Sequence, residues 1–258
     1  MHPILFQVGS SSIYSYGFFI ALGALGGLLY MAIQSKKHFG LSFDKSNSLF
    51  IYIVIAAVVG GKVFFFFENP QYYINNLEKL FAGNGFVFFG SLLFSIPTML
   101  WFFKKHGIPT LPMLDIMAIV TCIVHGFGRI GCFMAGCCHG KPTDSVFNVV
   151  FTSPLCQAEP LNTPLHPTQL YEAAFIFSLM TFLLMKKKRK QFDGQLFLLY
   201  LIIYSTGRSL LEILRGDEAR GFLIDAYLSH SQFISLIVIA SSLYFYAKLK
   251  RKGKLLKT

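Results

Sequence analysis

Residues 168–185 read TQLYEAAFIFSLMTFLLM, and the five residues that follow, 186–190, read KKKRK. An α-helix that crosses the ~30 Å hydrocarbon core of a bilayer needs roughly 20 mostly apolar residues. Strands of a membrane β-barrel would instead alternate apolar and polar residues, and the run FLLM at 182–185 does not alternate. The stretch therefore predicts a membrane-spanning helix that ends at a basic cluster.

The whole chain has the same character. Apolar residues make up 54% of its 258 residues and charged residues only 14%, and 29 residues are Phe. An ordinary soluble domain has about 25% charged residues. We predict an all-α membrane protein, a polytopic bundle of seven transmembrane helices within one integral-membrane domain over residues 1–258. The predicted spans are 11–34, 47–67, 86–103, 113–135, 168–185, 194–214 and 222–247.

The distribution of basic residues predicts the orientation of the bundle. The net charge of +11 would suggest a nucleic-acid partner in a soluble protein, but this composition has too little polar surface for one, and we expect none. With the N-terminus outside and the C-terminus in the cytoplasm, 16 of the 23 basic residues lie in inside segments, as the positive-inside rule requires. The other seven are Lys62, Lys79, Arg129, Lys141, Arg208, Arg215 and Arg220.

Charges inside a span are costly and are therefore candidates for function. In the sixth span, Tyr204, Arg208, Glu212 and Arg215 are spaced to form one stripe on one helical face. Arg208 and Glu212 can pair directly, and Arg215 is left to meet another anion. The stripe predicts either a charged cavity wall or an ion-pair network that orders the helices.

The fourth span carries Arg129 in a glycine-rich stretch, residues 125–143, with no acidic residue within a turn of it. Its partner is either a distant residue such as Glu172 or a ligand, and a guanidinium on such a backbone suits a phosphate. At the entry to the fifth span, His166, Gln169 and Glu172 fall on one side of the first turns. These three either contribute to the same site or anchor the helix at the interface.

The five cysteines form no standard zinc motif. Cys132, Cys137, Cys138 and His139 could ligate a metal, but their spacing lacks a Cys-x2-Cys pair, and we predict no metal. Cys156 could form a disulfide with Cys137 or Cys138 on an oxidising exterior, or the thiols could be inert or reactive. Cys122, deep in the fourth span, is expected to pack.

Four motifs together resemble the prolipoprotein diacylglyceryl transferase family, in the right order from about residue 3 to residue 250. They are Tyr16-Gly17, the segment from Gly128-Arg129 through Gly131, Phe133 and Gly136 to Gly140, the segment His166-Pro167-x-Gln169-Leu170-Tyr171-Glu172, and the stripe Tyr204, Arg208, Glu212 and Arg215.

The resemblance implies a multi-pass enzyme of the bacterial cytoplasmic (inner) membrane that needs no cofactor. Such enzymes transfer the sn-1,2-diacylglyceryl group of phosphatidylglycerol to the lipobox cysteine of prolipoprotein signal peptides and release glycerol 1-phosphate. Membrane lipids would be further partners. The alternatives are a paralogue with another acceptor, a lipid transporter or lipid-binding protein, and a membrane protein whose function is centred on its cysteines.

The family's residues are carried over by position. Arg129 matches a phospholipid-binding arginine, Arg208 a second essential arginine, and Glu212 the acid one turn later. We expect the catalytic residues to be Arg129, Arg208, Glu212 and His125. We expect the substrate-binding residues to be Arg129, Tyr16, Gly128, Gly140, Tyr204, His166, Gln169, Tyr171 and Glu172.

The chain departs from the family at several positions. The family has Asn at Cys132 and Ala135 and Glu at Cys137. It also has a His-Gly-Gly motif, with a proposed base, where this chain has Phe89-Gly90-Ser91. Phe cannot accept a proton. The base is then His125, which is nearest in sequence to Arg129, or His139 or His166, unless the field of the arginines alone generates the thiolate.

Overall fold

The computed structural model describes residues 2–9, 11–81, 85–216, 222–224 and 228–255. Arg220 and Lys257, counted above among the basic residues, lie outside the described residues. Most of the described chain is helical, which confirms an all-α membrane protein. Within the described residues, five helices are long and apolar enough to cross a membrane. They are α1 (Ser15–Phe39), α2 (Phe43–Glu68), α6 (Thr110–Ala135), α7 (Thr168–Lys187) and α9 (His230–Leu255).

The remaining helices are shorter. The third and sixth predicted spans contain α5 (Phe88–Lys105) and α8 (Gln195–Glu212), of 18 residues each, and α3 (Pro70–Asn75) and α4 (Leu77–Phe81) follow α2. Three two-stranded antiparallel sheets complete the described chain. They pair β1 (Ile4–Val8) with β2 (Ser11–Tyr14), β3 (Val149–Val150) with β4 (Pro164–Leu165), and β5 (Phe222–Ile224) with β6 (Leu228–Ser229).

Two helices begin later than their predicted spans. The first span was expected from residue 11, but residues 11–14 pair with β1 and the helix begins at Ser15. The last span was expected from residue 222, whereas α9 begins at His230, after β5 and β6. In both places the backbone finds its hydrogen bonds in a strand pair instead of a helical turn.

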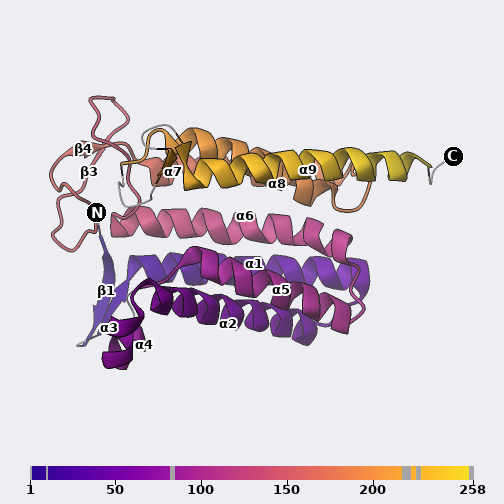
Figure 1. Cartoon of the computed structure of the whole chain (residues 1–258), viewed down its shortest axis with the longest axis horizontal. Helices are drawn as coiled ribbons and strands as arrows, with labels where there is room; N and C mark the ends of the chain where they lie inside the picture. The colour runs from indigo at the N-terminus through magenta and orange to yellow at the C-terminus, as the bar shows by residue number, and fades with distance from the viewer. Residues whose placement is uncertain (1, 10, 82–84, 217–221, 225–227, 256–258) are drawn as a thin grey trace. The chain divides into compact units, whose positions relative to one another are not determined.

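The chain forms two compact units, residues 1–29 with 114–258, and residues 30–113. In the first unit, α8 packs against α7 and α9 (Figure 1). The beginning of α1 packs closely on α6, because a Cβ at Gly23 would lie 2.8 Å from the Cβ of Phe127. In the second unit, α2 packs against α5. Gly60 and Gly90 meet there, and a Cβ on either would overlap the carbonyl oxygen of the other.

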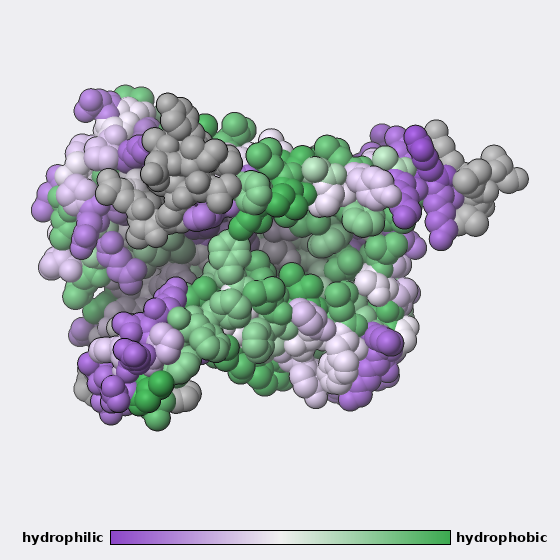
Figure 2. All heavy atoms as spheres, in the orientation of Figure 1, coloured by the Kyte–Doolittle hydropathy of each residue, from purple (hydrophilic) through white to green (hydrophobic). Residues whose placement is uncertain are grey.

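Large apolar side chains are exposed along the long helices. Leu236 and Ile237 of α9 are 57% and 54% exposed, and Ile55 of α2 is 55% exposed. In Figure 2, apolar residues cover the middle of the helices, and hydrophilic residues gather towards their ends. Such apolar surface would be unfavourable in water, so the pattern fits helices whose sides contact lipid.

A buried carboxylate connects α6 with the segment between α7 and α8. Asp115, only 4% exposed, accepts hydrogen bonds from the backbone N–H groups of Gly194 at 2.9 Å and Phe197 at 3.0 Å. Its Oδ2 atom also lies 3.0 Å from Lys190 Nζ. Gly194, with φ of +86°, precedes α8, so Asp115 satisfies N–H groups that the first turn of α8 leaves open.

Candidate functional site

Glu172, in the second turn of α7, is the centre of a buried polar cluster and is 2% exposed. Its Oε2 atom lies 3.1 Å from Arg129 Nε of α6. Its Oε1 atom accepts a hydrogen bond from the Tyr204 hydroxyl of α8 at 3.1 Å and lies 3.4 Å from His125 Nε2. Side chains of α6, α7 and α8 therefore meet at one carboxylate.

Two more arginines approach the same carboxylate. Arg208 Nη1 lies 3.9 Å from Glu172 Oε2, and Arg215 Nη1 lies 4.0 Å from it. The predicted pair of Arg208 with Glu212 is confirmed, with Nη2 and Oε2 at 2.6 Å. The anion that the sequence left open for Arg215 is Glu172. Three guanidinium groups and two carboxylates thus meet in one buried cluster of the described residues.

One donor of the cluster is unused. Arg208 Nη1 is buried, and among the residues that the structure describes it has no hydrogen-bond partner. Nearly all buried polar groups in proteins are hydrogen-bonded, so an exception of this kind calls for an explanation. An unused N–H donor of a guanidinium group matches an anionic ligand, since charge-assisted hydrogen bonds to arginine are among the strongest in proteins.

Close packing of α7 and α8 brings the cluster together. A Cβ at Gly207 would overlap the ring of Phe175, so glycine lets the two helices approach one residue before Arg208. Two other expected residues, Gly128 of α6 and Tyr16 of α1, lie near Arg129. Gly128 faces open space, and Gly131 accommodates Tyr16, whose carbonyl oxygen would lie 3.2 Å from a Cβ there. Tyr16 itself is 43% exposed at the beginning of α1.

Gly140 lies between two segments that carry expected residues. Its N–H donates to the carbonyl of His166 at 2.8 Å, and it forms a β-bridge with Arg215. A Cβ at this position would lie 2.6 Å from both the Cβ of His166 and the carbonyl oxygen of Leu214. Gly140 is therefore a packing position that brings the segment of Arg215 against the beginning of α7.

The remaining expected residues contact the loop between α6 and α7. Tyr171 donates a hydrogen bond to the carbonyl of Phe147 at 2.9 Å and lies 3.4 Å from His166 Nδ1. Gln169, fully buried, donates through Nε2 to the carbonyl of Cys137 at 2.7 Å. Within the described chain, the side chains of Tyr171 and Gln169 thus bind the loop, and that of His166 contacts Tyr171.

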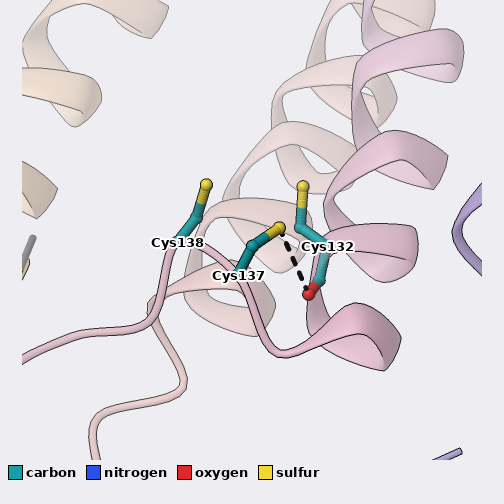
Figure 3. A group of neighbouring side chains, drawn as sticks. All are labelled: Cys132, Cys137 and Cys138. Atoms are coloured by element: carbon teal, nitrogen blue, oxygen red, sulfur yellow. Dashed lines mark hydrogen bonds between the residues drawn. The ribbon is translucent and has the colours of Figure 1, made fainter. Parts of the chain in front are cut away.

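Three of the four residues that the sequence named as possible metal ligands, Cys132, Cys137 and Cys138, lie together in the structure, although we predicted no metal there. All five cysteines are free. Cys156 lies in the apolar core of the loop with Phe151 and Leu165, while the sulfurs of Cys132, Cys137 and Cys138 lie within 4.8 Å of one another (Figure 3). Hydrogen bonds from the two neighbouring thiols and the charge of Arg215 lower the pKa of Cys138. In the sequence, Gly136 directly before Cys137 and Cys138 was the sign that the chain turns sharply at this point.

Comparison with known proteins agrees with this geometry. The chain belongs to the prolipoprotein diacylglyceryl transferase family, whose model matches residues 3–248. It is 40% identical to the phosphatidylglycerol--prolipoprotein diacylglyceryl transferase of Clostridium tetani, over 95% of this chain and 97% of that protein. It is 33% identical to the phosphatidylglycerol--prolipoprotein diacylglyceryl transferase 2 of Clostridium perfringens, over 98% of each chain. The phosphatidylglycerol--prolipoprotein diacylglyceryl transferase of Dehalococcoides mccartyi is 29% identical to this chain, over 98% of this chain and 95% of that protein.

Proposed function

We propose that this chain transfers the sn-1,2-diacylglyceryl group of phosphatidylglycerol to the lipobox cysteine of prolipoproteins and releases glycerol 1-phosphate. The names of its relatives support diacylglyceryl transfer from phosphatidylglycerol to prolipoprotein. The observation that carries the proposal is the buried arginine cluster on Glu172, with an Arg208 Nη1 donor that has no acceptor among the described residues. An oxygen of the phospholipid phosphate supplies the missing acceptor.

The reaction explains why buried arginine side chains would be needed at this site. The thiolate sulfur attacks the glycerol carbon that bears the phosphate, a C–S bond forms, and the C–O bond to the phosphate breaks. The bonding pair leaves with the phosphate monoester, which gains negative charge. Arg129 and Arg208 bind that phosphate, and their interaction strengthens as the charge develops, which lowers the barrier. Glu172 and Glu212 position the two guanidinium groups.

His125 is placed to accept the proton of the thiol. Its Nε2 atom lies 3.3 Å from Arg129 Nε, which donates to it, and 3.4 Å from Glu172 Oε1. Nε2 of a neutral His125 can accept the hydrogen bond from Arg129, and Nε2 of a protonated His125 can donate one to Glu172. The same nitrogen can thus take up a proton beside the bound phosphate, a role that Phe89 of α5 could not fill. Tyr16, Gly128 and Tyr204 would line the cavity for the head group.

The membrane arrangement is part of the proposal. All seven predicted spans would cross the bilayer as one integral-membrane domain, with α5 and α8 joining the five longer or more apolar helices. The N-terminus lies outside and the C-terminus in the cytoplasm, since this orientation puts 16 of the 23 basic residues on the inner side. The protein then resides in the bacterial inner membrane, where phosphatidylglycerol and other membrane lipids surround it.

The test uses purified protein with vesicles of glycerol-labelled phosphatidylglycerol and a synthetic lipobox peptide. We expect a peptide whose mass has increased by one diacylglyceryl group, together with release of labelled glycerol phosphate. A peptide with Ser in place of the lipobox Cys should remain unmodified. Lipid turnover without peptide modification would overturn the acceptor and favour the paralogue. Absence of both products would overturn the transfer reaction.

A further inference from the structure

A second cluster of chemically active side chains lies at the end of α6. The sulfurs of Cys132, Cys137 and Cys138 lie within 4.8 Å of one another, and all three residues are partly buried. In Figure 3, Cys132 projects from the last turns of the helix, and the side chains of Cys137 and Cys138 approach it from the loop. The proposed transfer reaction assigns no role to these three thiols.

The backbone is bent to bring the sulfurs together. Gly136, with φ of +80°, ends the helix, and Cys138 adopts φ of +61°. Positive φ is common for glycine but rare for residues with a side chain, and such strained positions concentrate at functional sites. The bend returns the chain over Cys132, so that the Cys137 thiol reaches the carbonyl of Cys132 at 3.7 Å.

Helix α7 holds this bend in place. Gln169 Nε2 donates to the carbonyl of Cys137 at 2.7 Å, and Thr168 Oγ1 donates to the carbonyl of Cys138 at 2.9 Å. Both donors belong to buried residues, 0% and 3% exposed. Two successive side chains of one helix thus fix two successive cysteines, and the three sulfurs are organised before any ligand binds.

We propose that Cys132, Cys137 and Cys138 together bind one thiophilic divalent metal ion, with Zn²⁺ as the reference case. Zn–S bonds of about 2.3 Å place the sulfurs of a trigonal or tetrahedral site about 3.8–4.0 Å apart. This spacing falls within the 4.8 Å limit on the distances between the three sulfurs. The thiols lose their protons to solvent as the three Zn–S bonds form.

The surroundings suit such a site. Three thiolates and one Zn²⁺ carry a net charge of −1, and the guanidinium groups of Arg129 and Arg215 lie beside the cysteines. His139 does not complete the shell, because Nδ1 lies 2.9 Å from the Gly140 carbonyl and Nε2 accepts from the N–H of Glu159. The fourth position is therefore left for water or another small ligand.

The proposal is tested by metal binding, without reference to lipid transfer. Reduced, metal-free protein in detergent is titrated with Zn²⁺, and with Cd²⁺ for its thiolate charge-transfer absorption. We expect one ion per chain and protection of three of the five cysteines from alkylation. The substitution Cys138→Ser should weaken Zn²⁺ binding by at least about tenfold, the loss usual when a metal site is perturbed.

Cys156→Ser is the matched control, because Cys156 is a buried cysteine of the same loop outside the cluster. It should keep one ion per chain. The melting temperature of each metal-free variant shows whether it is folded. Equal Zn²⁺ binding by folded protein that lacks all three cysteines would overturn the proposal. So would a disulfide within the cluster that persists in reductant and excludes Zn²⁺ from the wild-type chain.

Discussion

Arg129 and His125 lie one turn apart on α6, and Arg129 Nε donates to His125 Nε2 at 3.3 Å while both side chains contact Glu172. A cation and a proton acceptor are thus held by the same buried carboxylate. Binding of a phosphate to the arginine and transfer of a proton to the histidine would take place at neighbouring atoms, which makes the cluster testable one residue at a time.

The first prediction concerns Glu172. Glu172→Gln keeps the side-chain shape but removes the charge that positions the arginines. We expect kcat for lipid transfer to fall at least about tenfold, since a displaced guanidinium no longer meets the transition state, while KM for phosphatidylglycerol does not rise. Steady-state kinetics with phosphatidylglycerol vesicles give both constants. A higher KM at unchanged kcat would contradict a positioning role.

The second prediction compares arginine with lysine. Arg129→Lys and Arg208→Lys each keep the charge but lose the planar fork that binds phosphate through two hydrogen bonds. We expect lipid transfer to fall by more than about a hundredfold in each variant, as when one donor to a developing oxyanion is removed. Arg189→Lys, at an exposed position after α7, should retain wild-type activity. Retained transfer in either cluster variant would disprove its role at the phosphate.

The third prediction addresses the base. If His125 accepts the thiol proton, the rate of the wild-type protein rises with pH on the acidic side, because the protonated ring cannot accept another proton. His125→Asn should slow transfer and remove that rise from the profile of rate against pH. His106→Asn, at an exposed histidine of the second unit, should leave the profile unchanged. An unaltered profile in His125→Asn would exclude this base.

The fourth prediction concerns Gly140. Gly140→Ala places a methyl group against the backbone of Leu214, where there is no room for it, and should separate the segment of Arg215 from the beginning of α7. We expect transfer to fall at least about tenfold, because small displacements of a binding group are costly in rate. Gly17→Ala, where a Cβ meets open space, is the matched control. Full activity in Gly140→Ala would show that this contact is not needed.

The fifth prediction concerns stability. Asp115→Ala leaves the N–H groups of Gly194 and Phe197 unpaired and should lower the free energy of unfolding by about 2–4 kcal/mol. Asp115→Asn retains an acceptor and should cost less. Asp193→Asn, at an exposed carboxylate on the same lysine, should change it by less than about 1 kcal/mol. Thermal unfolding in detergent measures how much each of the three variants is destabilised. Equal destabilisation by all three would contradict the role given to Asp115.

The sequence could predict what depends on local spacing. Apolar runs located each long helix, and the four-residue spacing of Arg208 and Glu212 predicted their pair. The partner of Arg129 could not be chosen, because Glu172 is 43 residues away and only packing of α6 on α7 brings it to 3.1 Å. For a similar reason, the sequence could name Cys132, Cys137 and Cys138 as possible joint ligands but could not show that they meet. Their sulfurs meet through the positive φ of Cys138, a conformation that residue type does not predict.

The hydrogen bonds of Asp115 also bear on how the chain is made. Its three donors follow it by 75, 79 and 82 residues. Synthesis proceeds from the N-terminus, so α6 leaves the ribosome before those donors exist. The hydrogen bonds that hold Asp115 in the folded protein can therefore form only after the first turn of α8 has been synthesised.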